Sequence, residues 1–443
     1  MNYRNRLLLT ICSSVLCITA SSGKATIVTV SNTNDSGPGS LRQALFDSHD
    51  GDTINFDPSL KGQIITLTTG QLAIAKNVTI SGPGANLLAV SRDQSAPQFR
   101  IFNIAPNHSV SIQGLTISNG LASNSFGGGI YNQASQLSVI NCTVTANSAS
   151  FSGGGIQNES TVGSATLRIE NSTISGNSAG DYGGGIGNFE NGPHPVTLTI
   201  SNSTLSGNFA EFAGGAIVSF AGGQPASVSL SNSTLAGNTC PLHGGGISNA
   251  RTGSAPAVVE IGNTILKRGT AGENIDNSNG TVSSHGYNIS DDNGGGFLTG
   301  PGDQINIDPL LGPLQDNGGL TLTHELLPDS PAIDAGDPNF TPPPFFDQRG
   351  PGFDRVANGR IDIGSFEVQP QGTATPTPTT TTTPTATPTA TATATSTPTA
   401  TPTTTATPSA TPRPSPSPRL LPSPRPRPTL PPRPIVGALR QHS

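Results

Sequence analysis

The side chains best suited to chemistry are carboxylates near the end of the folded part of the chain. Five aspartates and two arginines lie close together on Gly- and Pro-rich stretches: Asp334, Asp337, Asp347, Asp354, Asp362, Arg349 and Arg360. Hard oxygen ligands on such loops suit Ca²⁺, so Asp334, Asp337, Asp347 and Asp362 are candidate calcium ligands. The alternative is a charge-paired motif that orders the loops of a cap. We favour the charge-paired motif and expect no cofactor.

The elements that position these carboxylates are built from repeats between residues 110 and 270. A Gly-Gly-x-Ile unit recurs with spacings of 26, 30, 31 and 30 residues, ending at Ile130, Ile156, Ile186, Ile217 and Ile247. A polar signature such as LRIENSTISGN follows each of the first four units, and its asparagines have spacings of 30, 31 and 30 residues. Two unrelated landmarks share one period, so the repeat is real.

Each repeat is composed of short strands and turns. Leu167 and Ile169, like Leu198 and Ile200, alternate with polar residues at strand period, and Gly, Ser, Thr and Asn between them favour turns over helices. A repeat of this kind fits one rung of a right-handed parallel β-helix, in which rungs stack about 4.8 Å apart. Leucine-rich repeats and propellers fit the spacing less well.

The repeat places identical residues in rows along the solenoid. The five isoleucines that end the Gly-Gly-x-Ile units form the predicted interior column. Asparagines form a corner row, which comprises Asn141, Asn171, Asn202, Asn232 and Asn263. Two further rows are Asn132, Asn158, Asn188 and Asn249, and Asn147, Asn177, Asn208 and Asn238. We interpret the corner row as a structural ladder of stacked amides, with glycosylation or a polar ligand face as the alternatives.

Cysteine positions are interpreted in the same register. Cys12 and Cys17 lie in an apolar amino-terminal stretch that is typical of a cleaved signal peptide, which leaves Cys142 and Cys240. These two lie three rungs apart, roughly 14 Å, whereas a disulfide requires Cα atoms closer than about 7 Å. We therefore predict two buried, unpaired thiols.

Five segments follow along the chain. Residues 1–25 are the signal peptide, and 26–109 hold an amino-terminal cap and the first rungs, with a cap helix that begins after Ser40. Residues 110–270 are the regular repeats, and 271–369 are the last rungs and a carboxy-terminal cap. Residues 370–443, rich in Thr, Pro and Arg, are expected to be a disordered stalk or spacer.

Composition and charge agree with this organisation. The chain has no Trp, 54 Gly and 33% hydrophobic residues, so its core must be built from small and aliphatic side chains. Residues 26–370 hold all 27 acidic side chains and 12 of the 21 basic ones, a formal charge of −15. This net negative charge of residues 26–370 argues against nucleic-acid binding, because the phosphate backbone would be repelled. No segment after the signal peptide is apolar enough to predict a transmembrane helix.

Motifs at both ends resemble known families. TVSNTNDSGPGSLRQAL and the following GDTINF resemble the amino-terminal region of secreted bacterial β-helix proteins, and the Gly-Gly-x-Ile units resemble repeats of polymorphic outer-membrane proteins. IDPLLGPLQDNGGLTLTHELLPDSPAIDAGD, DQRG and NGRIDIGSFE resemble the bacterial choice-of-anchor Q proteins. The resemblance covers about residues 27–368 and implies a pectin-lyase-like β-helix without established catalytic residues.

A catalytic site is not expected. A galacturonan hydrolase of this fold would require paired aspartates with Gly-His-Gly and Arg-x-Lys elements, and neither element occurs. Asp291 and Asp292 are adjacent but lie in a turn-forming DDNGGG stretch. The acids between Phe126 and Asn263 form no repeating column. With four Tyr and no Trp, the composition predicts few platforms for sugar stacking.

The sequence therefore predicts an exported, non-enzymatic β-helix protein with a structural or adhesive role at the cell surface or outside the cell. We expect a monomer whose partners are surface glycans or envelope polymers, with no nucleic acid among them. Two alternatives stay open. One is a divergent polysaccharide lyase or glycoside hydrolase of the same fold, and the other is a calcium-dependent surface binding module.

Overall fold

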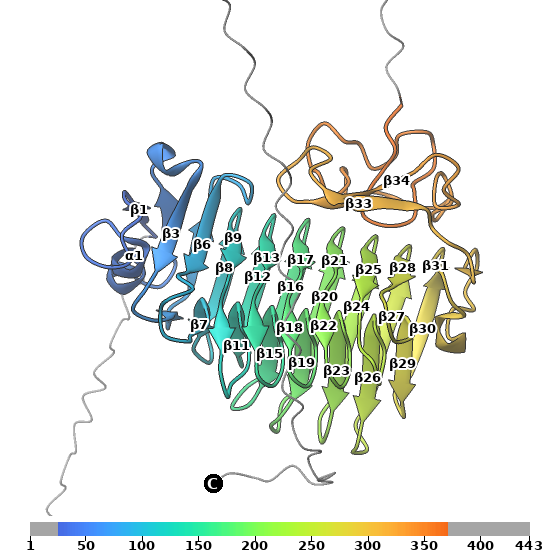
Figure 1. Ribbon diagram of the computed structural model, residues 1–443, viewed down its shortest axis with the longest axis horizontal. Helices are drawn as coiled ribbons and strands as arrows, with labels where there is room; N and C mark the ends of the chain where they lie inside the picture. Colours follow the sequence, from blue (N-terminus) through green and yellow to red (C-terminus); the bar gives the residue numbers. More distant parts are fainter. Residues whose placement is uncertain (1–24, 371–443) are drawn as a thin grey trace, which may run out of the picture. The chain divides into compact units, whose positions relative to one another are not determined.

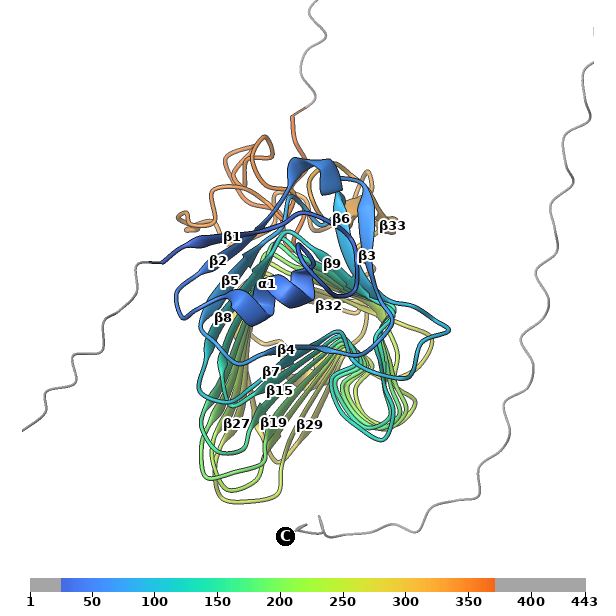
Figure 2. The same ribbon diagram turned by 90° about the vertical axis from the view of Figure 1, so that its left-hand side faces the viewer.

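The computed structural model describes residues 25–370. Apart from the residues at their junctions, the predicted signal peptide and the predicted tail lie outside this range. Within it, the chain is almost entirely strand, turn and loop, and consecutive turns of the chain stack as a parallel β-helix (Figures 1 and 2). The predicted fold class is thereby confirmed for residues 25–370. No helix in this range is both long and apolar enough to cross a membrane.

Sheet A is one of three long parallel sheets. Its strands pair in register, so that Leu167 lies between Leu137 and Leu198 of the neighbouring rungs. In spatial order its ten described strands are β1 (Ile27–Val30), β2 (Thr53–Phe56), β5 (Val78–Ser81), β8 (Ser109–Gln113), β12 (Gln136–Ile140), β16 (Ala165–Glu170), β20 (Val196–Ser201), β24 (Ala226–Ser231), β27 (Ala257–Gly262) and β30 (Thr281–Gly286).

Sheet B follows the corner asparagine of each regular rung. Its outward-facing positions carry a row of hydroxyl groups, because Thr173 pairs with Thr204 and Thr204 with Thr234. The ten described strands are β3 (Gln63–Leu67), β6 (Leu88–Arg92), β9 (Thr116–Ser118), β13 (Thr143–Thr145), β17 (Thr173–Ser175), β21 (Thr204–Ser206), β25 (Thr234–Asn238), β28 (Ile265–Arg268), β31 (Ile289–Ser290) and β32 (Gln304–Ile305).

Sheet C begins at the isoleucine of each Gly-Gly-x-Ile unit. Its eight described strands are β4 (Leu72–Ile74), β7 (Phe102–Ile104), β11 (Ile130–Gln133), β15 (Ile156–Ser160), β19 (Ile186–Glu190), β23 (Ile217–Ala221), β26 (Ile247–Arg251) and β29 (Ile275–Ser278). Short strands form sheet D between sheets B and C: β10 (Leu121–Ala122), β14 (Ser148–Ala149), β18 (Ser178–Ala179) and β22 (Phe209–Ala210).

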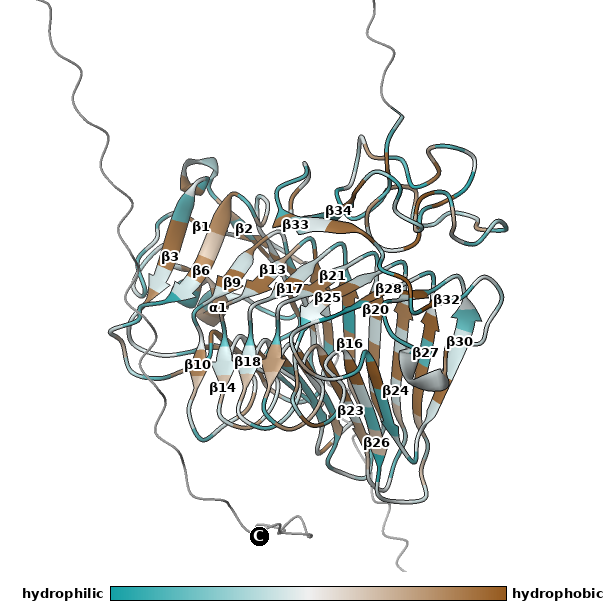
Figure 3. Cartoon of the chain, turned by 45° about the vertical axis from the view of Figure 1, so that its right-hand side comes forward, coloured by the Kyte–Doolittle hydropathy of each residue, from teal (hydrophilic) through white to brown (hydrophobic). Residues whose placement is uncertain are grey.

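The core fills the space between the sheets. In β20 the inward residues Val196, Leu198 and Ile200 are fully buried, and they alternate with outward polar residues, as the colour changes along the strands in Figure 3 illustrate. The five isoleucines that begin the strands of sheet C from β11 to β26 stack in register, and each is 0% exposed. Burying each such side chain stabilises the fold by about 1.5–3 kcal/mol.

The glycines before these isoleucines let neighbouring rungs approach closely. A Cβ added at Gly154 would lie 2.3 Å from Ser178 O, and one at Gly184 would lie 2.2 Å from Phe209 O. Gly183 also has a φ of +61°, in the region that side chains with a Cβ rarely adopt. The repeated glycines are therefore required by backbone contact between rungs as well as by turn geometry.

Both remaining thiols are buried and unpaired, as predicted. Cys142 and Cys240 are each 0% exposed. Burial raises the pKa of Cys142 to about 12, which keeps this thiol protonated and unreactive.

A short helix covers the first rung. Helix α1 (Leu41–Asp47) begins after Ser40, whose side chain accepts a hydrogen bond from Gln43 N, and Leu41, Ala44 and Leu45 on its inner side are buried. Figure 2 shows α1 across the opening of the solenoid, where it covers strand edges that would otherwise be free. A one-turn 3-10 helix, η1 (Pro58–Leu60), follows β2.

The last part of the described chain returns along the outside of the solenoid. After η2 (Gly294–Gly296), strands β33 (Leu311–Gln315) and β34 (Thr323–Leu326) form an antiparallel pair, and loops continue from there to residue 370. We call residues 309–369 the clasp. Figure 1 shows the clasp beside the later rungs, and hydrogen bonds join it to sheet B and to the corner asparagines.

Candidate functional site

Only two of the four candidate calcium ligands come together. Asp334 and Asp362 lie beside Glu367, and carboxyl oxygens of these three residues lie within 4.8 Å of one another. Glu367 was not among the candidate ligands, although it lies in the GSFE end of the NGRIDIGSFE motif. Both oxygens of Asp362 accept backbone hydrogen bonds, one from Asp334 N and the other from Val368 N, each at 2.6 Å. These carboxylates hold the loops of the clasp together.

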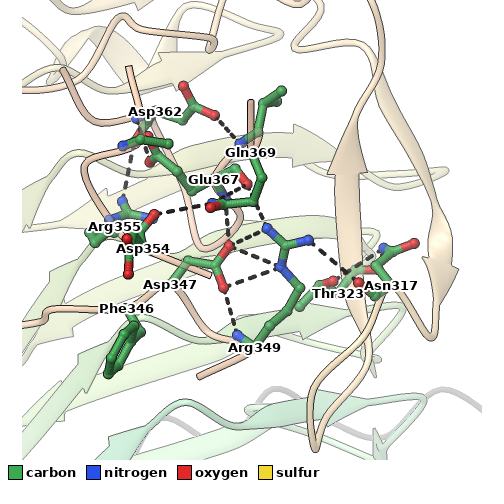
Figure 4. Close-up of polar contacts among 12 residues, drawn as sticks. Asn317, Thr323, Phe346, Asp347, Arg349, Asp354, Arg355, Asp362, Glu367 and Gln369 are labelled. Carbon is green, nitrogen blue, oxygen red and sulfur yellow. Dashed lines mark hydrogen bonds and ion pairs between the residues drawn. The ribbon is translucent and has the colours of Figure 1, made fainter. Parts of the chain in front are cut away.

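The other two candidates lie elsewhere in the clasp. Asp347 forms an ion pair with Arg349 at 2.6 Å, and both side chains are almost completely buried (Figure 4). The Arg349 guanidinium lies between the rings of Phe353 and Phe366, at 3.9 and 3.8 Å from their centroids. Asp337 instead accepts a hydrogen bond from Asn339 N at 2.9 Å, within a local turn.

A second buried arginine lies next to the carboxylates. Arg355 is 0% exposed, and its Nη2 donates to Asn232 Oδ1, Asp362 O and Gly364 O at 3.3, 3.1 and 2.7 Å. Its Nε and Nη1 are buried without a hydrogen-bond partner. The cluster therefore already contains a positive side chain, an arrangement suited to ordering loops by charge pairing, and we assign no metal ligand here.

Burial and mutual repulsion change the protonation of the two buried acids. Burial raises the pKa of Glu367 to about 8, with the neighbouring Asp362 acting in the same direction and Arg355 opposing it. Burial also raises the pKa of Asp362 to about 6, against the effect of hydrogen bonds from Val368 N and Asp334 N. Near neutral pH, Glu367 thus stays largely protonated.

The corner asparagine row lies partly under the clasp. All five members have φ between +47° and +52°, the left-handed geometry that asparagine tolerates best. Their amides bond to one another at two steps, from Asn202 to Asn171 at 2.7 Å and from Asn263 to Asn232 at 2.8 Å. Asn202 and Asn263 also donate to Phe346 O and Asp362 O of the clasp. The row is therefore both a turn element and an attachment point for the clasp.

The most complete amide ladder is a different row. Asn147, Asn177, Asn208 and Asn238 are each 1% exposed, and every Nδ2 in the first three donates to the Oδ1 of the next residue at 2.9–3.0 Å. Each of these oxygens also accepts the backbone N–H of the preceding asparagine at 3.0 Å. The sequence shows both rows with the same period and does not distinguish them.

An aromatic row lines the turn that precedes sheet C. It comprises Phe126, Phe151, Tyr182, Phe212 and His243, each four or five residues before the isoleucine of its rung. Ring centroids lie 5.4 Å apart for Phe126 and Phe151, 5.2 Å for Tyr182 and Phe212, and 5.4 Å for Phe212 and His243. Phe212 is 44% exposed, and the side chain of His243 is 48% exposed.

Further rings project from the outer face of sheet C toward this row. Phe189 and Phe220 pair in register with stacked rings 5.8 Å apart, and Phe189 lies 5.9 Å from Tyr182. Tyr131 lies 6.2 Å from Phe126 at the other end. We call the aromatic row and these three rings the aromatic face. Composition alone suggested few platforms for sugar stacking, but the repeat gathers its rings on one side. The sequence signal that could have predicted this row is its period, because each ring comes four or five residues before the isoleucine of its rung.

Polar groups lie at one end of the aromatic face. The Arg100 guanidinium lies 4.7 Å from the centroid of Tyr131 and donates to Asn103 Oδ1 at 3.0 Å. Tyr131 donates its hydroxyl to Glu159, which is 5% exposed. Burial and the Glu159 carboxylate raise the pKa of Tyr131 well above its ordinary value, and burial lowers the pKa of Arg100. Neither group is poised to accept a proton at neutral pH.

The carboxylates of sheet C are engaged in structural bonds. Glu159 accepts from both Tyr131 and Asn191. Glu190 accepts from the backbone N–H groups of Gly222 and Gly223, at 2.7 Å each. Acid–base hydrolysis of a glycoside requires two carboxyl groups that face one bond, whereas Glu159 and Glu190 both accept hydrogen bonds from loop residues, Asn191 and Gly192 among them.

Comparisons with known proteins give only a distant structural likeness. No protein-family model and no curated protein sequence matches this chain. A solved structure that matches, "Crystal structure of pectate lyase Pel9A", has 13% sequence identity and a TM-score of 0.38, covering 78% of this chain and 96% of that chain. The resemblance to choice-of-anchor Q proteins therefore rests on the sequence motifs alone.

Proposed function

We propose that this chain is an exported, non-enzymatic β-helix protein that binds a glycan chain along its aromatic face. The observation that carries this proposal is the alignment of partly exposed rings along neighbouring rungs, of which Phe212 and His243 are the most exposed. Aromatic faces carry partial negative charge and attract the C–H groups of a sugar ring. Because rungs repeat about every 4.8 Å, rings on successive rungs offer a linear polymer a series of equivalent contacts.

Charge favours a neutral glycan as the ligand. The formal charge of residues 26–370 is −15. The basic side chains described on the aromatic face are Arg100 and His243, and His243 lies 3.8 Å from the carboxylate of Asp276. A polyanion would be repelled by the acidic body. Hydroxyl groups of a neutral chain can instead accept from Arg100 and exchange hydrogen bonds with Asn103 and with Gln133, whose Nε2 donates to Asn103 Oδ1 at 2.9 Å.

The test is binding of the mature chain, residues 26–443, to neutral linear glycans such as cellohexaose, xylohexaose and mannohexaose, with polygalacturonate as the acidic comparison. The double variant F189S/F220S removes two stacked rings. At about 1 kcal/mol per ring, affinity for the bound glycan should fall roughly 30-fold. The control F46S changes a phenylalanine of α1 that is 77% exposed and lies far from this face. Equal affinities for both variants, or no binding to any neutral glycan, would contradict the proposal.

One observation favours the alternative of a divergent lyase, namely the proximity of Arg100, Tyr131 and Glu159. A lyase would release unsaturated products from acidic glycans, and the variant R100A would abolish that release. We expect neither the wild type nor R100A to release an unsaturated product. Binding that a chelator abolishes would instead favour the calcium-dependent module.

Export and display are part of the same proposal. Residues 1–25 have the layout of a signal peptide, and the Thr- and Pro-rich tail suits a stalk between the β-helix and a cell surface. Cell fractionation should find the mature chain on the surface or in the medium. Recovery of the chain with residues 1–25 intact from the cytoplasm would contradict export.

A further inference from the structure

The clasp is attached to the solenoid through polar contacts. Thr204 Oγ1 donates to Gln348 Oε1 at 2.6 Å, and Gln348 Nε2 donates to Thr173 Oγ1 at 2.9 Å. Ser365 N donates to Thr234 Oγ1 at 3.1 Å. These groups are almost fully buried, yet each hydroxyl of sheet B could bond to water instead if the clasp moved away. The clasp can therefore separate from sheet B without unfolding of the rungs beneath it.

A smaller apolar cluster joins the clasp to the last rungs. Ile265 and Ile289 of sheet B pack with Leu326, Ala332 and Ile363 of the clasp, apart from the main core of the solenoid. Opening the clasp would expose this cluster but leave the main core covered. Burial of this cluster therefore favours the closed state. The charges beside the cluster can shift the equilibrium between the closed and the open clasp.

The buried charges of the clasp do not balance when all acids are ionised. Three carboxyl groups, on Asp347, Asp362 and Glu367, are 0–1% exposed, whereas only two arginines, Arg349 and Arg355, are buried with them. Asp347 is paired with Arg349, which leaves Arg355 for both Asp362 and Glu367. One of the three buried carboxyl groups therefore lacks a counter-charge.

We propose that the clasp is a pH-sensitive closure, tight in acid and released as Glu367 loses its proton, which uncovers the corner asparagines and the outer face of sheet B. The proton passes to solvent, and the carboxylate left behind gains hydration when the clasp opens. In the closed clasp it accepts from Asp362 N at 2.8 Å and from Ala357 N at 3.4 Å, which does not offset its burial beside Asp362. Between the ordinary pKa of a glutamic acid, 4.5, and its pKa of about 8 in the closed clasp, the closed state binds one more proton than the open state. The closed clasp therefore loses stability as pH rises through this range, and above it the pH dependence ends.

The surroundings of Glu367 contain no further positive group to compensate. Within the described residues, Asp334 lies at the edge of the cluster and adds negative charge. Arg360 donates to Ala335 O and Gly336 O and lies over Tyr287 instead. From the solenoid side, the groups that contact the clasp near this cluster are uncharged: Asn202, Asn232, Thr234 and Asn263.

The histidine of the clasp does not supply the missing charge either. His324, on β34, lies 2.9 Å from Ser206 Oγ, and its Nδ1 lies 2.8 Å from Gly312 O. Burial lowers the pKa of His324 below its ordinary 6.5, so this side chain is neutral at pH 7 and above. Lys267 is paired with Asp308 at 2.6 Å.

Hydrogen–deuterium exchange of the mature chain, read by mass spectrometry at pH 5, 6, 7, 8 and 9, tests the proposal. Exchange of clasp peptides is divided by that of the same peptides in E367Q at the same pH, which cancels the intrinsic pH dependence. Opening in the wild type should rise by up to about tenfold per pH unit for one proton, reach at least tenfold between pH 6 and pH 8, and level off above pH 8. E367Q, which mimics the protonated acid, should stay closed throughout.

Controls separate the closure from general loosening. Peptides of β16 and β20 should stay protected at every pH, and D329N, which changes an exposed acid of the clasp, should behave as the wild type. If E367Q does not protect its clasp at pH 5, D362N and the ratio of clasp to β16 peptides in the wild type give the same readout. Identical pH profiles in wild type and variants, or protection that depends on added Ca²⁺, would overturn the proposal.

Discussion

The internal amide ladder can be tested by the substitution Asn208→Ala. The Asn208 side chain is 1% exposed and makes four hydrogen bonds. Its Nδ2 donates to Ile174 O and Asn238 Oδ1 at 2.9 Å, and its Oδ1 accepts from the backbone N and the Nδ2 of Asn177 at 3.0 Å. At a net contribution of about 1 kcal/mol each, their loss should lower the free energy of unfolding by about 4 kcal/mol.

The loss cannot be recovered by simple hydration. Alanine leaves the backbone N–H of Asn177 facing the dry interior, where an unpaired donor is unfavourable. Urea denaturation of the mature chain, followed by far-UV circular dichroism, measures the change. Because stacked repeats can unfold in stages, hydrogen exchange of β17 and β21 should be measured alongside.

A control variant removes an exposed asparagine side chain. Asn124 lies at an exposed turn with a φ of 50°, whereas the φ of Asn208 is not positive, so any strain of left-handed geometry falls on the Asn124 variant alone. Asn124→Ala should therefore destabilise by no more than about 1 kcal/mol, the effect of left-handed geometry without the buried bonds. Equal losses for the two variants, or a loss below about 1 kcal/mol for Asn208→Ala, would show that the buried amide bonds of the ladder do not stabilise the fold.

Three further outcomes follow from single features. Gly184→Ala places a Cβ 2.2 Å from Phe209 O and should cost about 2 kcal/mol or more in denaturation, whereas a fold that tolerates it would show that rungs can separate. Burial disfavours ionised Asp35, but hydrogen bonds from Arg42 and two threonines outweigh this effect and hold the pKa of Asp35 well below 3.8. The protection of amino-terminal peptides against hydrogen exchange should therefore weaken as pH falls below 3.8 in the wild type, and it should not weaken in D35N. A thiol reagent should find no reactive cysteine in the native mature chain and two in unreduced denatured chain, and finding none after denaturation would reveal a disulfide.

Much of the fold could be predicted because the repeat makes one local pattern recur. Stacking of Ile130, Ile156 and Ile186 follows from their spacing, since parallel strands in a β-helix pair residues one period apart. The cap helix was predictable because Ser40 provides a local N-cap. These features depend on contacts within a rung or between adjacent rungs, and a repeating sequence specifies both.

The candidate site was predictable only in part. The aspartates of the clasp were visible as a group, but their partners were not. Asp347 pairs with Arg349 two residues away, whereas Asp362 meets Glu367 and a buried Arg355 through loops without regular structure. Composition also understated the aromatic face, because it counts rings without stating that the repeat aligns them.

Period and composition were enough to predict the stacked rungs, the interior column and the acidic character of the chain. The folded structure was needed to show that residues 309–369 fold back over sheet B, that the clasp buries three carboxyl groups with two arginines, and that the rings gather on one side. The contacts between the clasp and sheet B join residues more than one hundred positions apart, as between Thr204 and Gln348, so no period in the sequence links them. The buried charges meet through loops without regular structure, and composition counts rings without giving their positions.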